Sequence, residues 1–183
     1  MRRACVVVAL AVLLGAAACS WLGAPKADIE SAKRFDSFPL YWVGERFEQW
    51  DLVAIDGLQG PQEFVTFVYG TCKATGGEQP SCAPPLEIQV SRLCSHLDVV
   101  ARAPIWRERN LRGAPVGTID SAPVLFSSGA QVKLYRGEGS DPGLPLRALH
   151  ALRSVNRVAP VIGETDPIPA PATEVLAGTR PCA

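Results

Sequence analysis

Residues 86–90, Leu86-Glu87-Ile88-Gln89-Val90, alternate apolar and polar side chains without a break. Successive side chains of a β-strand point to opposite faces, so this alternation predicts a strand with one face on a core. The upstream run Phe64–Tyr69 is apolar on both faces, as expected of a strand inside a sheet. Downstream, Val124–Phe126 and Val132–Tyr135 flank the sequence Ser127-Ser128-Gly129-Ala130, which is typical of a hairpin loop. Further short strands are expected at Leu40–Val43, Leu52–Ile55, Val99–Trp106 and Gly113–Ile119.

The spacing of apolar residues changes near the C-terminus and predicts one helix. Asp141 precedes Pro142, which is a favoured start for a helix. An apolar stripe at helical spacing follows, made of Leu144, Ala148, Leu152 and Val155. After Asn156 prolines recur, so the tail is expected to be extended. The expected fold is α+β, a mostly antiparallel sheet with one C-terminal amphipathic helix.

The N-terminus has the layout of a secretory signal peptide. Arg2 and Arg3 precede the apolar run Ala4–Leu14, and Gly15-Ala16-Ala17-Ala18 then leads to Cys19. A cysteine directly after small residues resembles the signal peptide of bacterial lipoproteins. That resemblance implies that residues 1–18 are removed and that Cys19, as the new first residue, carries lipid. The protein is then expected at the extracytoplasmic face of the cell membrane, and the membrane is its first expected partner.

Two alternatives remain for the anchor. The lipoprotein pattern prefers Leu where this chain has Ala16, and Ala16-Ala17-Ala18 also suits ordinary secretory cleavage. Residues 4–25 contain no charge and would be long enough, as a helix, to remain as an uncleaved membrane anchor. All three interpretations place the domain outside the cytoplasm. We expect a tether over residues 19–37 and a single globular domain over 38–183 with a Pro-rich tail.

Charge excludes one broad class of function. The chain has 18 basic and 18 acidic residues, and loss of Arg2 and Arg3 with the signal leaves 16 against 18, a net charge of −2. A protein with this balance is not expected to bind nucleic acid through the phosphate backbone.

The cysteines that follow Cys19 predict two disulfides, because an even number in an exported chain favours pairing. Cys72 and Cys82 enclose a Gly- and Pro-containing loop between two expected strands, so they are expected to pair across its base. Cys94 lies an extended segment beyond Cys82, too far for a disulfide, which leaves Cys182 as its partner. A zinc site is the competing interpretation, but the spacings lack the close pairs that zinc sites use.

No motif of a known catalytic centre is apparent, and no cofactor is expected. His96 and His150 are the only histidines, and the segment Gly137–Gly143 departs from nucleotide-binding spacing. The acidic residues Glu45, Glu48, Asp51 and Asp56 could supply a glycosidase pair, but their spacing does not demand one. On the expected helix, a basic face suits an anionic lipid or wall polymer; it consists of Arg147, His150, Arg153 and Arg157.

The central stretch points to no specific activity. Tyr69-Gly70-Thr71-Cys72, Cys82-Ala83-Pro84-Pro85-Leu86 and Cys94 resemble exported proteins of actinobacteria with no assigned activity. That resemblance implies secretion and a disulfide-bonded domain, and identifies neither site residues nor a protein partner. A non-catalytic binding or structural role in the envelope is therefore expected. The alternative is a cell-surface hydrolase that acts on an envelope polymer.

Overall fold

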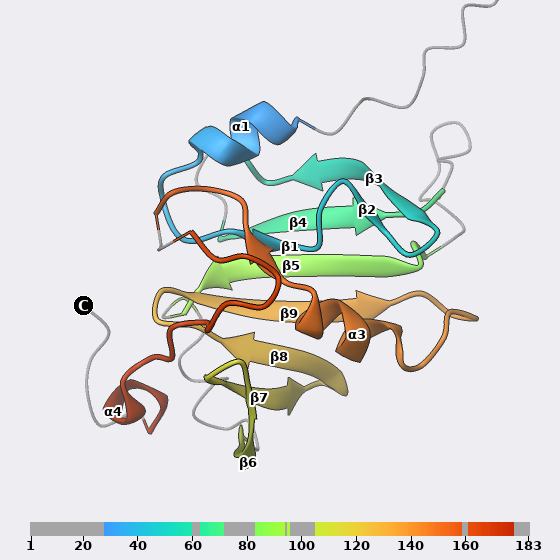
Figure 1. Ribbon diagram of the computed structural model, residues 1–183. Coiled ribbons are helices and arrows are strands. Elements are labelled where there is room, and N and C mark those ends of the chain that lie inside the picture. Colours follow the sequence, from blue (N-terminus) through green and yellow to red (C-terminus); the bar gives the residue numbers. More distant parts are fainter. Residues whose placement is uncertain are drawn as a thin grey trace, which may run out of the picture.

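The computed structural model describes residues 28–59, 63–71, 83–93, 95, 105–158 and 161–177. Its main element is an antiparallel sheet of eight strands in the order β2-β3-β4-β5-β9-β8-β7-β6 (Figure 1). The strands are β2 (Arg46–Phe47), β3 (Trp50–Asp56), β4 (Phe64–Tyr69), β5 (Leu86–Arg92), β6 (Ile105–Leu111), β7 (Ala114–Ile119), β8 (Ala122–Phe126) and β9 (Ala130–Arg136). The prediction of a mostly antiparallel sheet is confirmed.

The sheet consists of two four-stranded meanders placed side by side. β2 to β5 pair in chain order, β6 to β9 do the same, and β9 then pairs with β5. The junction is the most regular part, with Leu86 to Arg92 opposite Arg136 to Ala130 without a bulge. The strand predicted from residues 86–90 therefore joins the two meanders, and its partner β9 begins 38 residues after β5 ends.

Tight turns close the second meander. Arg112 and Gly113, between β6 and β7, both have positive φ angles of 52° and 92°. Asp120 and Ser121, between β7 and β8, have φ angles of 48° and 65°. Two positive φ angles in succession define the type I′ turn, whose twist matches that of a hairpin. The predicted β8–β9 hairpin is also confirmed, since the Ser127 amide donates to the Ala130 carbonyl at 2.8 Å.

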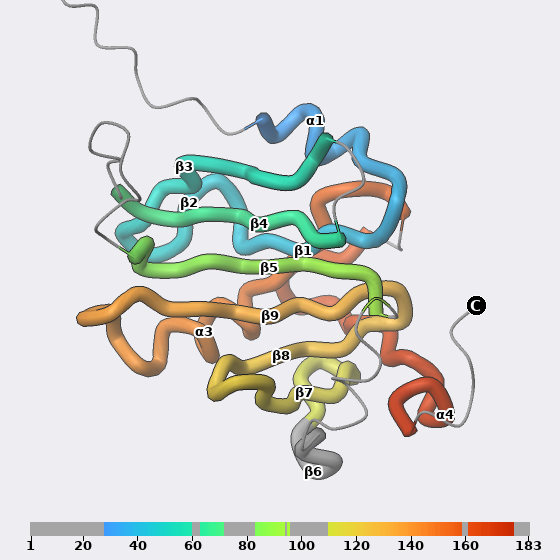
Figure 2. Tube along the Cα trace, turned by 180° about the vertical axis from the view of Figure 1, so that it is seen from behind, coloured from blue at the N-terminus to red at the C-terminus, as the bar shows by residue number. Residues whose placement is uncertain are grey.

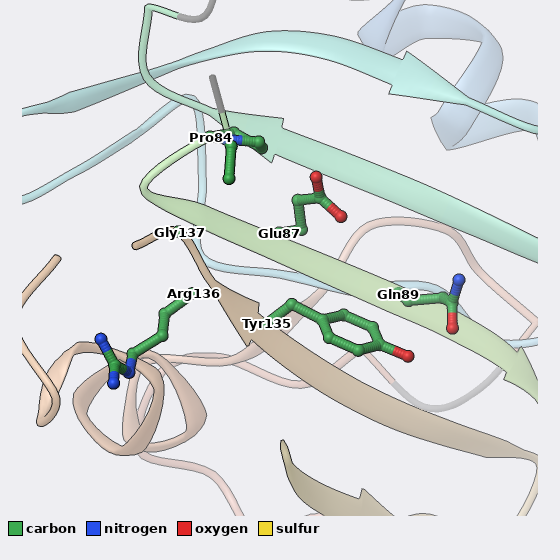
Figure 3. A pocket seen from close by; sticks show the side chains of 7 residues that line it. Pro84, Glu87, Gln89, Tyr135, Arg136 and Gly137 are labelled. Atoms are coloured by element: carbon green, nitrogen blue, oxygen red, sulfur yellow. The ribbon is translucent and has the colours of Figure 1, made fainter. Parts of the chain in front are cut away.

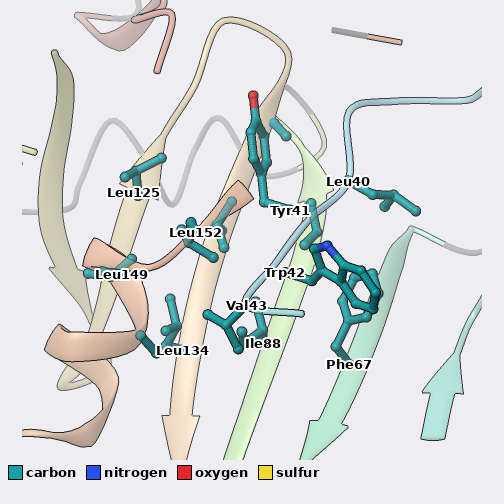
Figure 4. Close-up of a cluster of buried hydrophobic side chains, with 14 of the residues drawn as sticks. Leu40, Tyr41, Trp42, Val43, Phe67, Ile88, Leu125, Leu134, Leu149 and Leu152 are labelled. Carbon is teal, nitrogen blue, oxygen red and sulfur yellow. The ribbon is translucent and has the colours of Figure 1, made fainter. Parts of the chain in front are cut away.

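A second layer covers one face of this sheet (Figure 1). It contains α1 (Ile29–Arg34), α3 (Leu144–His150) and a small sheet of β1 (Tyr41–Trp42) and β10 (Arg153–Ser154). Side chains of alternate residues of β4, β5 and β9 form the core beneath it (Figure 4). A smaller cluster packs at the β7–β8 end on the opposite face, against α4 (Thr173–Leu176). Among the described residues, no helix has the length and apolar content to span a bilayer.

The expected tether ends earlier than Ser37. Asp28 begins α1 by accepting a hydrogen bond from the Ser31 amide at 2.9 Å. Ala32 is fully buried in the core, and Ile29 and Phe35 pack against it. The boundary at residue 37 was therefore wrong, because burial of these side chains makes α1 part of the domain.

The C-terminal helix is also shorter than predicted. α3 ends at His150, and Arg153 pairs with Trp42 in the small sheet. The Val155 amide donates to the Leu40 carbonyl at 2.9 Å, so the backbone here is used in long-range pairing instead of a helix. The predicted start is displaced too, since the Asp141 carboxylate accepts from the Gly143 amide before the helix begins.

Two polar side chains attach this C-terminal segment to the domain. The Asn156 side chain is 2% exposed, accepts from the Leu40 amide at 2.9 Å and donates to the Phe35 and Phe38 carbonyls at 2.8 Å. The Arg112 guanidinium, at the β6–β7 turn, donates to carbonyls of four residues, His150, Leu152, Gly163 and Asp166. Each bridges segments that are far apart in the sequence.

Candidate binding face of the sheet

The face of the sheet opposite the core carries polar side chains in register across four strands. Asp56 of β3, Thr66 of β4, Gln89 of β5 and Lys133 of β9 lie side by side in one row. Figure 2 views the molecule from the side opposite to that of Figure 1, so that this face is toward the reader. None of the described helices crosses it over β3, β4 and β5. The strand pairing therefore places a carboxylate, a hydroxyl, an amide and an ammonium group next to one another.

Two flanking rows extend this surface. Val68, Glu87 and Tyr135 form the row on one side. The row on the other side is formed by Phe64, Ser91 and Gln131. Side chains that are two residues apart on a strand share a face, so all three rows face away from the main core. We call this surface the polar face: Asp56, Phe64, Thr66, Val68, Glu87, Gln89, Ser91, Gln131, Lys133 and Tyr135.

Accessibility differs within the polar face. Four polar members are under 10% exposed, namely Thr66, Ser91, Gln131 and Lys133. Phe64 is 39% exposed, whereas Glu87, Gln89 and Tyr135 are half-buried. A ligand on this face would therefore contact Phe64, Glu87, Gln89 and Tyr135 before it reached the four more buried side chains.

The buried cation of the polar face already has partners. Lys133 Nζ lies 3.0 Å from Asp120 Oδ2 of the β7–β8 turn and 4.9 Å from the centre of the Tyr135 ring. Burial lowers the pKa of the Lys133 ammonium, but hydrogen bonds to Tyr135 and Asp120 outweigh it and leave the pKa above its usual value. The Lys133 side chain thus stays protonated, and the Asp120 carboxylate balances its charge. Few of its hydrogen-bond donors are left for an anionic ligand.

Glu87 lies in a shallow hollow at the edge of the polar face (Figure 3). The hollow measures about 260 Å³ and is lined by Ala83, Pro84, Glu87, Gln89, Tyr135, Arg136 and Gly137. Burial raises the pKa of the Glu87 carboxyl, and the nearby Asp56 charge raises it further. Within the described part of the chain, no hydrogen bond or ion pair satisfies this carboxylate. Glu87 is therefore free to accept hydrogen bonds from a ligand.

Another polar-face group lacks a partner. Gln131 is 6% exposed, and its side-chain carbonyl oxygen Oε1 has no hydrogen-bond partner among the described residues. Leaving such an atom buried and unpaired costs about 1–3 kcal/mol, and most buried polar groups avoid it. The polar face therefore contains one hydrogen-bond acceptor, Gln131 Oε1, that no donor of the described residues satisfies.

The four residues of the predicted basic face do not lie on one helix. Arg147 on α3 is held by Glu48, at 2.6 and 3.2 Å, and by Asp141 at 2.8 Å. These contacts raise the pKa of its guanidinium. His150 ends the helix with an exposed side chain, and Arg153 belongs to β10, where its guanidinium lies 5.8 Å from the Trp42 ring centre.

Arg157 is exposed beyond both elements. The assumption that one helix continues through residue 157 produced this error. An anionic partner at these four residues stays a prediction, now without the helical surface that motivated it.

Other predicted residues lie outside the described residues or apart from one another. Cys19, Cys72, Cys82, Cys94, Cys182 and His96 all fall outside the described ranges. Of the carboxylates considered for a glycosidase pair, Glu48 binds Arg147, Asp51 lies 3.7 Å from Arg46, and only Asp56 belongs to the polar face. No group of three or more His, Cys, Asp or Glu residues able to hold a metal occurs in the described part.

Sequence reasoning missed the polar face. Its signal was present in the alternation of β5, where Glu87 and Gln89 point away from the core, and of β9, where Lys133 and Tyr135 do the same. What the alternation could not reveal is that β5 and β9 are neighbours. Comparison with known proteins found no family model, no curated protein and no solved structure that matches the chain.

Proposed function

We propose that this protein is an exported, lipid-anchored module of the cell envelope that binds an envelope polymer on its polar face without catalysing a reaction. The observation that supports it is the register of the sheet, which arrays hydrogen-bonding side chains over neighbouring strands. An extended ligand can contact several of them at once.

The chemistry of this face suits a hydroxyl-rich polymer. Gln89 offers both an amide donor and a carbonyl acceptor. Glu87, when it is ionised, offers acceptors and no donor. The Tyr135 ring beside them offers an apolar surface with a polar end. The hollow beside Glu87 is open to solvent and is not a closed cavity. It can therefore hold one segment of a long polymer whose remaining length extends beyond the hollow on both sides.

Binding is tested by sedimentation of the full-length protein in detergent with purified cell-wall polymer. Gln89→Ala and Tyr135→Ala should each lower the bound fraction, because both side chains are accessible on the polar face. Val161→Ala is the control, since Val161 is 78% exposed and lies elsewhere. Equal binding by all four proteins would refute a role of the polar face.

The anchor is supported by the signal layout that ends at Cys19. Nine residues, 19–27, precede Asp28 in the chain after cleavage. They could extend at most about 30 Å, so the domain would stay close to the lipid surface. Intact-mass analysis of the native protein should show a lipid adduct that Cys19→Ala abolishes. An unmodified soluble form would contradict the lipid anchor.

We also propose two disulfides, Cys72 with Cys82 and Cys94 with Cys182. The second would close a loop of 89 residues and could stabilise the domain by about 4–5 kcal/mol through the unfolded state. Peptide mapping without reduction identifies the pairs. Stoichiometric metal bound to reduced thiols would overturn this assignment.

A hydrolase is the second candidate, favoured by one observation. Asp56 and Glu87 share the polar face, and the Asp56 charge contributes to the raised pKa of Glu87. Glycoside hydrolysis uses two carboxyl groups of which one has a raised pKa, although here β4 lies between the two strands that carry them. Release of soluble fragments from the polymer, lost in Glu87→Gln while binding persists, would establish the hydrolase. Binding without release supports the non-catalytic module.

A further inference from the structure

Three of the accessible side chains of the polar face form a straight diagonal across three strands. Tyr135 is a diagonal neighbour of Gln89, because Gln89 pairs with Lys133, two residues before Tyr135. Gln89 is in turn a diagonal neighbour of Phe64, because it pairs with Thr66. Each diagonal step measures about 7–8 Å, so the two aromatic side chains are about 15 Å apart.

Burial separates this diagonal from its surroundings on one side. Phe64 is exposed, and Gln89 and Tyr135 are half-buried. On one side of it, Ser91, Gln131 and Lys133 are under 10% exposed, and Thr66 on the other side is equally buried. On the other side, however, Glu87 and Val68 are half-buried and Asp56 is exposed. A ligand that follows the line from Tyr135 to Phe64 can therefore also reach Glu87.

The charges near the diagonal point to an uncharged ligand. Lys133, the cation beside it, is neutralised by Asp120 at 3.0 Å. The other ionisable groups of the polar face, Asp56 and Glu87, are carboxylates, and Glu87 lies directly opposite Tyr135. Arg136 lines the hollow, but it pairs with the core residue Leu86, so its side chain leaves the sheet on the opposite face, where it donates to the Ser140 carbonyl at 3.0 Å (Figure 3). A polyanion would be repelled by both carboxylates, whereas neutral hydroxyl groups can donate to them.

We infer that the ligand is an uncharged, linear glycan that crosses the strands from Tyr135 over Gln89 to Phe64. This inference rests on the proposed binding function of the polar face. The two rings stack on separate sugar units, and the Gln89 amide hydrogen-bonds the chain between them. A short oligomer reaches one ring only, whereas a longer one contacts both and gains affinity because its second contact is intramolecular.

The experiment is calorimetric titration of the full-length protein in detergent with oligomers of N-acetylglucosamine, from the disaccharide to the octasaccharide. Affinity should rise by about tenfold or more with length and then level off once the chain spans both rings. Phe64→Leu, which keeps an apolar side chain at a surface position, should remove this gain and leave disaccharide binding unchanged. Tyr135→Phe keeps the ring and should retain the gain, whereas Tyr135→Ala should weaken binding at every length.

Val158→Ala is the matched control, because Val158 is an apolar residue in the segment after β10 and is 43% exposed, close to the 39% of Phe64. Affinity that is independent of length, or a Phe64→Leu protein that keeps the gain, would overturn the diagonal path. Tighter binding of an anionic wall polymer than of the neutral oligomers would overturn the uncharged ligand. Both outcomes leave binding at the polar face intact. Failure to bind any polymer would instead refute the proposed function itself.

Discussion

Arg112→Met should destabilise the domain more than substitution of any other arginine whose side chain the structure describes. Arg112 Nε donates to the Asp166 carbonyl at 2.6 Å, and one terminal nitrogen donates to the Leu152 carbonyl at 2.5 Å and to that of His150 at 3.4 Å. The other terminal nitrogen donates to the Gly163 carbonyl. The guanidinium thus ties the end of α3 and the loop after β10 to the β6–β7 turn. Methionine keeps most of the apolar stem and removes every donor.

The expected magnitude follows from the two partly buried bonds, to Leu152 and Gly163. A hydrogen bond from a charged group contributes about 1.5–3 kcal/mol, and the carbonyls left behind are unpaired. The two more exposed bonds add little, so the expected loss in the free energy of unfolding is about 3–5 kcal/mol. Arg112→Lys keeps the charge but lacks the planar fork, and should lose about half as much.

Urea unfolding of the full-length protein, followed by tryptophan fluorescence, measures this loss. With a slope of about 2 kcal/mol per molar urea, the unfolding midpoint of Arg112→Met should fall by about 2 M. Arg157→Met is the control, because Arg157 is exposed and makes no hydrogen bond or ion pair within the described part of the chain. A loss below about 1 kcal/mol for Arg112→Met, or an equal loss in the control, would refute the structural role assigned to Arg112.

Two further substitutions test the packing and the electrostatics. Asn156→Ala should lower the free energy of unfolding by about 2–4 kcal/mol, because it leaves one buried amide and two carbonyls without partners; urea unfolding measures this, and an unchanged midpoint would contradict it. Glu87→Gln should stabilise the domain more at pH 7 than at pH 4. Glu87 has a raised pKa in the folded state, so the folded protein retains its proton to higher pH, and stability falls as pH rises through the interval above the ordinary glutamate value. Glutamine removes that penalty, and a gain that is equal at both pH values would show that Glu87 titrates normally.

Several strands were predictable because their evidence is local. Residues 64–69 were predicted as a strand and form β4 with the same bounds, and the alternating run 86–90 lies within β5. The loop at 127–130 was predictable for the same reason, since turn residues separate two apolar runs. Prediction failed where local pattern and long-range pairing conflict. Leu152 and Val155 have helical spacing with Leu144, yet the backbone after residue 152 pairs with β1 and Leu40.

By itself, the sequence determined the strands β3, β4, β5, β7, β8 and β9, the antiparallel character of the sheet and the face of β5 that lies on the core, because side-chain alternation is a property of the local chain. It also supplied the whole argument for export and for lipid on Cys19. The tertiary structure alone decided that β5 lies beside β9 and that α1 belongs to the core. It alone brought Tyr135, Gln89 and Phe64 onto one diagonal. These arrangements depend on which distant segments pair, and pairing is decided by the burial and hydrogen bonding of the whole chain rather than by any one stretch of it.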